Sequence, residues 1–105
     1  FAYLHIYSPC TTGWRFPSAE NIEVARKAVE TNFVMLWEFN PRDGLRLSRS
    51  LDDPRPIDEY LEALGKYRHL EPEQVGHIEA TLQKNVELIR GLAEGRHAAA
   101  ARLPA

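Results

Sequence analysis

The chain has 105 residues, a length that fits one domain or part of one. Hydrophobic residues make up 44% and charged residues 27%, which is the composition of a folded globular domain rather than of a disordered chain. The formal net charge of −2 provides no basic excess for nucleic acid or an anionic membrane. The longest apolar run, Phe33–Phe39, contains a glutamate and is far shorter than the ~20 residues of a membrane-spanning helix. We therefore expect no nucleic-acid partner and no membrane span.

The first half of the chain is predicted to form a βαβ unit. Phe1–Tyr7 is rich in aromatic and β-branched residues, which indicates a strand. A helix is predicted to open at Pro17 with Ser18 as its N-cap, and its apolar face comprises Ile22, Ala25, Ala28 and Val29. The continuous apolar run Phe33–Phe39 is typical of a strand covered on both faces. Strand, crossover helix and strand in this order predict a parallel sheet.

The second half is predicted to contain a β-hairpin and two helices. The turn residues of positions 40–44, "NPRDG", join Phe39 to a second strand at Leu45–Ser48. Pro56 suits the first position of a helix whose apolar face is Ile57, Tyr60, Leu61 and Leu64. A second helix starts at Pro72, and its apolar face comprises Val75, Ile78, Leu82, Val86, Ile89 and Leu92. The tail 96–105 has no such face, and we expect it to be flexible.

The single cysteine, Cys10, lies between Pro9 and Gly13 in a turn that follows the first predicted strand. Ligand sites in open α/β sheets gather at the carboxyl ends of strands, where a thiolate can act as nucleophile, redox thiol or metal ligand. His5 would be about 17 Å away along a strand that rises roughly 3.3 Å per residue, so it is a poor catalytic base. A small buried apolar cysteine is the alternative. One cysteine without a secretory signal before it suits a reducing interior, so we expect a cytoplasmic protein.

The residues that follow Cys10 have the small and polar character of an anion-binding turn. Thr11, Thr12 and Gly13 offer backbone N–H groups and hydroxyls ahead of a helix. A complete zinc or iron–sulfur site within this chain is excluded, because no second cysteine is present and the histidines are scattered.

Three ordered segments resemble one protein family: "YLHIYSPCTTGW", "IEVARKAVETNFVMLWEF" and "RPIDEYLEALGKYRHL". They are similar to the C-terminal third of the β subunit of 2-oxoacid:ferredoxin oxidoreductases, and to the pyruvate type most of all. The resemblance covers about residues 2–90. It implies an α/β fold, namely the C-terminal βαβ portion of a thiamin diphosphate-binding parallel-sheet domain, followed by the hairpin and two C-terminal helices. Residues 1–50 would end that domain, 51–95 would form a helical extension packed on the domain or on partner subunits, and 96–105 would be the tail.

The resemblance also implies a function. Enzymes of this family decarboxylate a 2-oxoacid on thiamin diphosphate and Mg²⁺, transfer the acyl group to CoA, and pass electrons through 4Fe–4S clusters to ferredoxin. In the family's β subunit the loop that matches "SPCTTGW" supplies the fourth cysteine of a cluster, so Cys10 would be one iron ligand. Because the residues beside Cys10 are small and hydroxylated, we also expect backbone N–H groups around Thr11, Thr12 and Gly13 to donate hydrogen bonds to cluster sulfurs. The other three cysteines and the thiamin and magnesium ligands are missing from this sequence. The segment alone would therefore be inactive, and its partners would be subunits of the α, γ and δ type, ferredoxin or another acceptor, the 2-oxoacid and CoA.

A second hypothesis is a non-catalytic interaction module. In this interpretation the long helix Val75–Leu92 binds a groove on a partner protein, and the thiol is inert.

Overall fold

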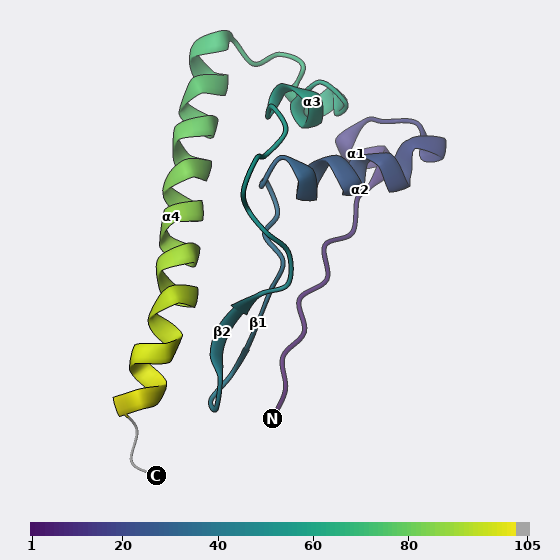
Figure 1. The fold of residues 1–105 in the computed structure, drawn as a ribbon. Coiled ribbons are helices and arrows are strands. Elements are labelled where there is room, and N and C mark those ends of the chain that lie inside the picture. The colour runs from purple at the N-terminus through teal and green to yellow at the C-terminus, as the bar shows by residue number, and fades with distance from the viewer. Residues whose placement is uncertain (103–105) are drawn as a thin grey trace.

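The computed structural model describes residues 1–102, with side chains described as far as residue 95. Within these residues, four α-helices and two strands follow in the order α1 (Thr11–Trp14), α2 (Asn21–Glu30), β1 (Trp37–Asn40), β2 (Gly44–Leu47), α3 (Asp58–Leu61) and α4 (Pro72–Arg102), with 3₁₀ turns at Ser18–Glu20 and Gly65–Tyr67. In Figure 1 the helices α1, α2 and α3 gather at one end of the molecule, and α4 runs the length of the hairpin. Within the part of the chain that is described, no helix is both long and apolar enough to cross a membrane.

The hairpin predicted from its turn residues is confirmed. β1 and β2 pair in antiparallel register, with Trp37 opposite Leu47 and Phe39 opposite Leu45. Gly44 has φ 76°, a conformation that glycine adopts without steric cost. The side-chain oxygen of Asn40 accepts a hydrogen bond from the backbone N–H of Asp43 at 2.7 Å, which closes the turn.

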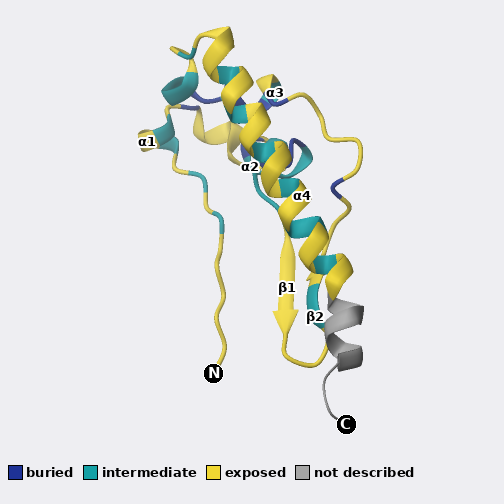
Figure 2. Cartoon of the chain, turned by 90° about the vertical axis from the view of Figure 1, so that its left-hand side faces the viewer, coloured by how far each residue is buried: buried dark blue, intermediate teal, exposed yellow. Residues whose placement is uncertain are grey.

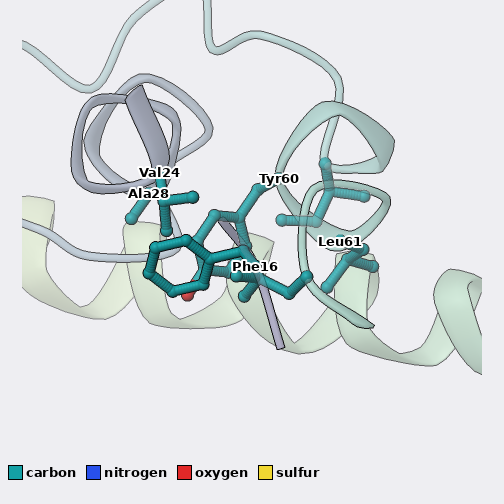
Figure 3. Close-up of a cluster of buried hydrophobic side chains, with 7 residues drawn as sticks. Phe16, Val24, Ala28, Tyr60 and Leu61 are labelled. Carbon is teal, nitrogen blue, oxygen red and sulfur yellow. The ribbon is translucent and has the colours of Figure 1, made fainter. Parts of the chain in front are cut away.

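A single hydrophobic core holds the helical end together. Its buried side chains come from the loop after α1, from α2, and from α3 with its flanking residues; they are Phe16, Val24, Ala28, Ile57, Tyr60, Leu61 and Leu64 (Figure 3). The predicted apolar face of α3 is therefore confirmed in full. The core contains residues from before and from after position 50. The division of the chain into a domain end and a helical extension stays a prediction.

The predicted face of α2 is only partly right. Ala28 is fully buried as expected, but Ile22 is 68% exposed and Val24 takes the second core position, four residues before Ala28. The prediction of Ser18 as N-cap is wrong: Ser18 is the first residue of a 3₁₀ turn, and Glu20 is the residue that precedes α2 as its N-cap, without a side-chain hydrogen bond. Asn32 ends the helix in a left-handed conformation (φ 63°), and its side-chain amide donates to the carbonyl of Leu51 at 2.9 Å. This buried hydrogen bond ties the end of α2 to the segment before α3.

The predicted parallel βαβ unit is wrong for this structure. Among the described residues the one sheet is the antiparallel hairpin. Phe1–Tyr7 is extended but pairs with no strand, and it rises toward α1 while β1 descends from the end of α2 (Figure 1). Within Phe33–Phe39 only the part from Trp37 onward is a strand, because Phe33 turns instead toward Tyr60, with 4.5 Å between their ring centroids. The α/β class holds, with helices and a two-stranded sheet.

Helix α4 begins at Pro72 as predicted. Five members of its predicted face are half-buried, namely Val75, Ile78, Leu82, Val86 and Ile89, whereas Leu92 is 53% exposed. The helix continues through Arg102, so most of the expected tail is helical, and residues 103–105 lie outside the described part. The flexibility expected for residues 96–105 stays a prediction.

The molecule is elongated and exposes much apolar surface. Its radius of gyration is 16.5 Å, against about 13 Å for a compact domain of this length. Figure 2 shows the N-terminal segment and β1 as almost wholly exposed. The large hydrophobic side chains left exposed include Phe1, Tyr3, Leu4, Ile6, Trp37 and Phe39. Large exposed apolar side chains of this kind occur at protein-binding and ligand-binding surfaces and in aggregation-prone chains.

Candidate functional site

Cys10 caps the short helix α1 with its own sulfur. The residue is extended (φ −114°, ψ 110°), and Sγ accepts a hydrogen bond from the backbone N–H of Gly13 at 3.3 Å. Its carbonyl accepts a second bond from the N–H of Trp14 at 3.0 Å. The thiol is free and exposed. The alternative of a buried apolar cysteine is therefore wrong for this chain, and the sulfur is open to a ligand.

Gly13 leaves space beside that sulfur. A Cβ atom at this position would lie 3.4 Å from Sγ of Cys10, which is ordinary van der Waals contact. With glycine the space is empty, and the N–H that points at Sγ is not screened by a side chain. The turn therefore carries no side chain at position 13 next to the sulfur.

The turn is closed by a contact with a distant part of the chain. Arg15 ends α1 in the left-handed conformation, with φ 57°, which is uncommon for a residue with a Cβ. Its carbonyl accepts a hydrogen bond from the N–H of Gly65 at 2.9 Å, and the next residue, Phe16, is buried in the core. A Cβ at Gly65 would lie 2.5 Å from Cβ of Arg15, so only glycine allows this approach.

Aromatic side chains hold the other side of the turn. The rings of Tyr7 and Trp14 lie 5.5 Å apart, and the ammonium of Lys66 lies 4.1 Å from the centre of the Trp14 ring, in cation–π geometry. The hydroxyls of Tyr7 and Tyr60 are hydrogen-bonded at 2.6 Å. Burial raises the pKa of both tyrosines above the ordinary value of 10.0, so both are neutral at physiological pH.

The four residues predicted for the site are therefore together in a single helical turn. Thr11 is half-buried, while Cys10, Thr12 and Gly13 are exposed. The sequence patterns did not indicate the contribution of Tyr60, Gly65 and Lys66, which come from α3 and from the 3₁₀ turn that follows it. The available signal was the third family-like segment, "RPIDEYLEALGKYRHL", which contains all three residues.

The turn offers one side chain, that of Cys10, that could act as a ligand of a metal cluster. Among the residues that the structure describes, no group of three or more histidine, cysteine, aspartate or glutamate side chains could hold a metal ion. Cys10 offers a single thiolate in a fixed turn, with an N–H donor on its sulfur and free space beside it. Such a sulfur could serve as one ligand of a cluster only together with further ligands from outside the described residues.

No family model matches the chain, but several curated proteins do. The β subunit of the NADH-dependent phenylglyoxylate dehydrogenase of Aromatoleum evansii is 59% identical over 97 residues, which are 92% of this chain and 22% of the relative. The pyruvate synthase subunit PorB of Methanothermobacter thermautotrophicus is 41% identical over 74% of the chain and 27% of the relative. The ketoisovalerate oxidoreductase subunit VorB of Pyrococcus horikoshii is 31% identical over 89% of the chain and 30% of the relative.

The chain spans less than a third of the length of these relatives. The similarity nevertheless extends over most of the chain itself, and it agrees with the family that the three sequence segments resemble. Over most of its length, the chain is a homologue of the β subunits of 2-oxoacid:ferredoxin oxidoreductases.

Proposed function

We propose that this chain is the part of a 2-oxoacid oxidoreductase β subunit that supplies one cysteine ligand, Cys10, to a 4Fe–4S cluster. The observation that carries the proposal is the exposed Sγ of Cys10, fixed by the N–H of Gly13 in a turn with open space beside the sulfur. The homology with oxidoreductase β subunits supports it. The remaining cluster ligands would come from parts of the subunit outside this chain.

A bound cluster would supply one-electron transfer, and the turn would contribute to it in three ways. Cys10 contributes a thiolate whose backbone is held by the hydrogen bonds of α1, so the sulfur needs little reorganisation on binding iron. The N–H of Gly13 withdraws electron density from that sulfur, and the N–H groups of Thr11 and Thr12 are proposed to donate to cluster sulfides, which raises the reduction potential.

The complete reaction belongs to the proposed complex and not to this chain alone. It converts a 2-oxoacid and CoA to acyl-CoA and CO₂, with two electrons passed to ferredoxin or another acceptor. Thiamin diphosphate and Mg²⁺ would be bound by residues outside this sequence. The partners would be subunits of the α, γ and δ type, in the cytoplasm.

For the substrate we propose an aryl-substituted 2-oxoacid. The phenylglyoxylate dehydrogenase subunit is 59% identical to this chain, against 41% for the pyruvate synthase subunit and 31% for the ketoisovalerate oxidoreductase subunit. Comparing phenylglyoxylate, pyruvate and ketoisovalerate as substrates of the purified complex tests this choice. A higher kcat/KM with pyruvate or ketoisovalerate would contradict it.

Replacing Cys10 in the intact complex tests the cluster assignment. Cys10→Ala should remove the signal of one cluster from the low-temperature EPR spectrum and abolish electron transfer from the 2-oxoacid to the acceptor. Ser8→Ala is the matched control, because Ser8 is an exposed residue of the same loop. If iron content and EPR spectrum are the same in both variants, Cys10 is no ligand, and the interaction-module hypothesis replaces the cluster assignment.

A further inference from the structure

We propose that the segment Tyr60–Tyr67 is a positioning element for the turn that carries Cys10, and that Gly65 is the residue on which it depends. This inference rests on the proposed function, because it assigns to these residues the orientation of a cluster ligand. None of them touches the thiol. They act through Tyr7, Trp14 and Arg15, which flank it along the chain.

The first contact is the close approach of Gly65 to Arg15. The left-handed conformation of Arg15 directs its Cβ toward Gly65, where a second Cβ would lie only 2.5 Å away and 2.9 Å from the Arg15 carbonyl oxygen. Both distances are too short for any side chain, and the second atom is backbone, which cannot move aside independently. A side chain at position 65 must therefore push the end of α1 away from the core.

The displacement would be transmitted directly to the sulfur. Cys10 is the N-cap of α1 and Arg15 is its C-cap. The helix between them is a single turn, Thr11–Trp14. The N–H groups of Gly13 and Trp14 bond to the sulfur and carbonyl of Cys10. A shift at Arg15 thus moves or breaks the bonds that fix the thiolate.

Two further contacts bind the same segment to the same turn. Tyr60 is hydrogen-bonded through its hydroxyl to Tyr7, on the N-terminal side of Cys10. Lys66 lies over Trp14, on the C-terminal side. The segment therefore holds the turn at three points, before and after the cysteine, while the cysteine itself stays exposed. This arrangement fixes the position of the thiolate without covering it.

The test uses the intact complex and three measurements. These are the EPR spectrum of the Cys10-dependent cluster, its midpoint potential, and hydrogen exchange of the amides of Gly13, Trp14 and Phe16. Gly65→Ala should alter the cluster signal and its potential, and should speed exchange of these amides by about tenfold or more, as expected for overpacking of a tight contact. Gly91→Ala is the matched control, since a Cβ at that position meets nothing within 4 Å. It should leave all three measurements unchanged.

A compensating change identifies the contact that is responsible. Arg15→Gly removes the clashing Cβ and suits the left-handed conformation. The double variant Arg15→Gly with Gly65→Ala should therefore lie closer to the parent than Gly65→Ala alone. If Gly65→Ala does not assemble, an assembled double variant supports the proposal. Because the contact of 2.9 Å with the carbonyl oxygen of residue 15 remains in the double variant, Lys66→Met decides the proposal if neither variant assembles.

Lys66→Met probes the third contact without a steric clash. The variant removes the ammonium that lies over the Trp14 ring, so the turn is held less firmly and exchange of the Trp14 amide should become faster. If Gly65→Ala and Lys66→Met both match the parent in potential, EPR spectrum and amide exchange, the positioning role is wrong. If Cys10→Ala leaves the cluster spectrum intact, the proposed function fails instead, and amide exchange in Gly65→Ala still decides whether the turn is held by this segment.

Discussion

The hydroxyl groups of Tyr7 and Tyr60 form a hydrogen bond of 2.6 Å between residues that are 53 positions apart in the sequence. Tyr60 is 1% exposed, so its hydroxyl depends on Tyr7 for a partner. Replacing Tyr60 by Phe keeps the ring in the core and leaves Tyr7 without this bond. We expect the free energy of unfolding of the full-length subunit to fall by about 1 kcal/mol, measured by denaturant titration. Tyr3→Phe, at a residue that is 76% exposed, is the control and should have no effect.

The same pair predicts a pH dependence. Burial raises the pKa of Tyr60, and the hydrogen bond with Tyr7 adds to this effect; burial also raises the pKa of Tyr7. Because the folded state retains these protons more strongly than the unfolded state, their contribution to stability is complete below pH 10 and falls as the pH rises above it. The difference in phenolate absorbance between the parent and Tyr60→Phe should therefore titrate well above pH 10. Titration of this difference at the ordinary pKa would contradict the buried hydrogen bond.

Gly13→Ala should separate folding from cluster binding. The residue is helical, so alanine is tolerated or even favoured by the backbone. The added methyl group lies 3.4 Å from Sγ of Cys10, in the space proposed for the cluster. We expect normal assembly of the subunit with reduced iron and sulfide content, measured by chemical analysis of the purified complex. Full cluster occupancy in this variant would mean that the cluster approaches the sulfur from another side.

The exposed apolar surface predicts how the isolated 105-residue chain behaves. Trp37 is 51% and Phe39 63% exposed, and β1 is hydrogen-bonded only to β2 among the described residues, so its outer edge is open. The isolated chain should aggregate and bind a hydrophobic dye, and Trp37→Thr with Phe39→Thr should reduce both effects. Glu38→Gln, in the same strand, is the control. A soluble chain that binds no dye would show that the apolar surface at Trp37 and Phe39 is tolerated in water without a covering protein.

The parts of the fold that were predictable from the sequence are those set by local chemistry. The turn from Asn40 to Gly44 specifies the hairpin through one side-chain cap and one positive φ, and the apolar spacing around Tyr60 specifies the face of α3. The strand predicted at Phe1–Tyr7 failed because a strand requires a partner, and periodicity alone does not supply one. The contact between Gly65 and Arg15 joins distant segments, so neither residue signals it locally.

Helix α4 has an open outer face on which three glycines lie, Gly76, Gly91 and Gly95, each with no atom near its missing Cβ. In a helix interior each glycine costs about 1 kcal/mol relative to alanine, so an isolated helix of this sequence is marginal. Its packing on β2, and that of Val75, Ile78 and Leu82 on the core, must supply the difference. A change that detaches the hairpin should therefore loosen the part of α4 beyond Leu82, while the first turns of the helix stay held by the core.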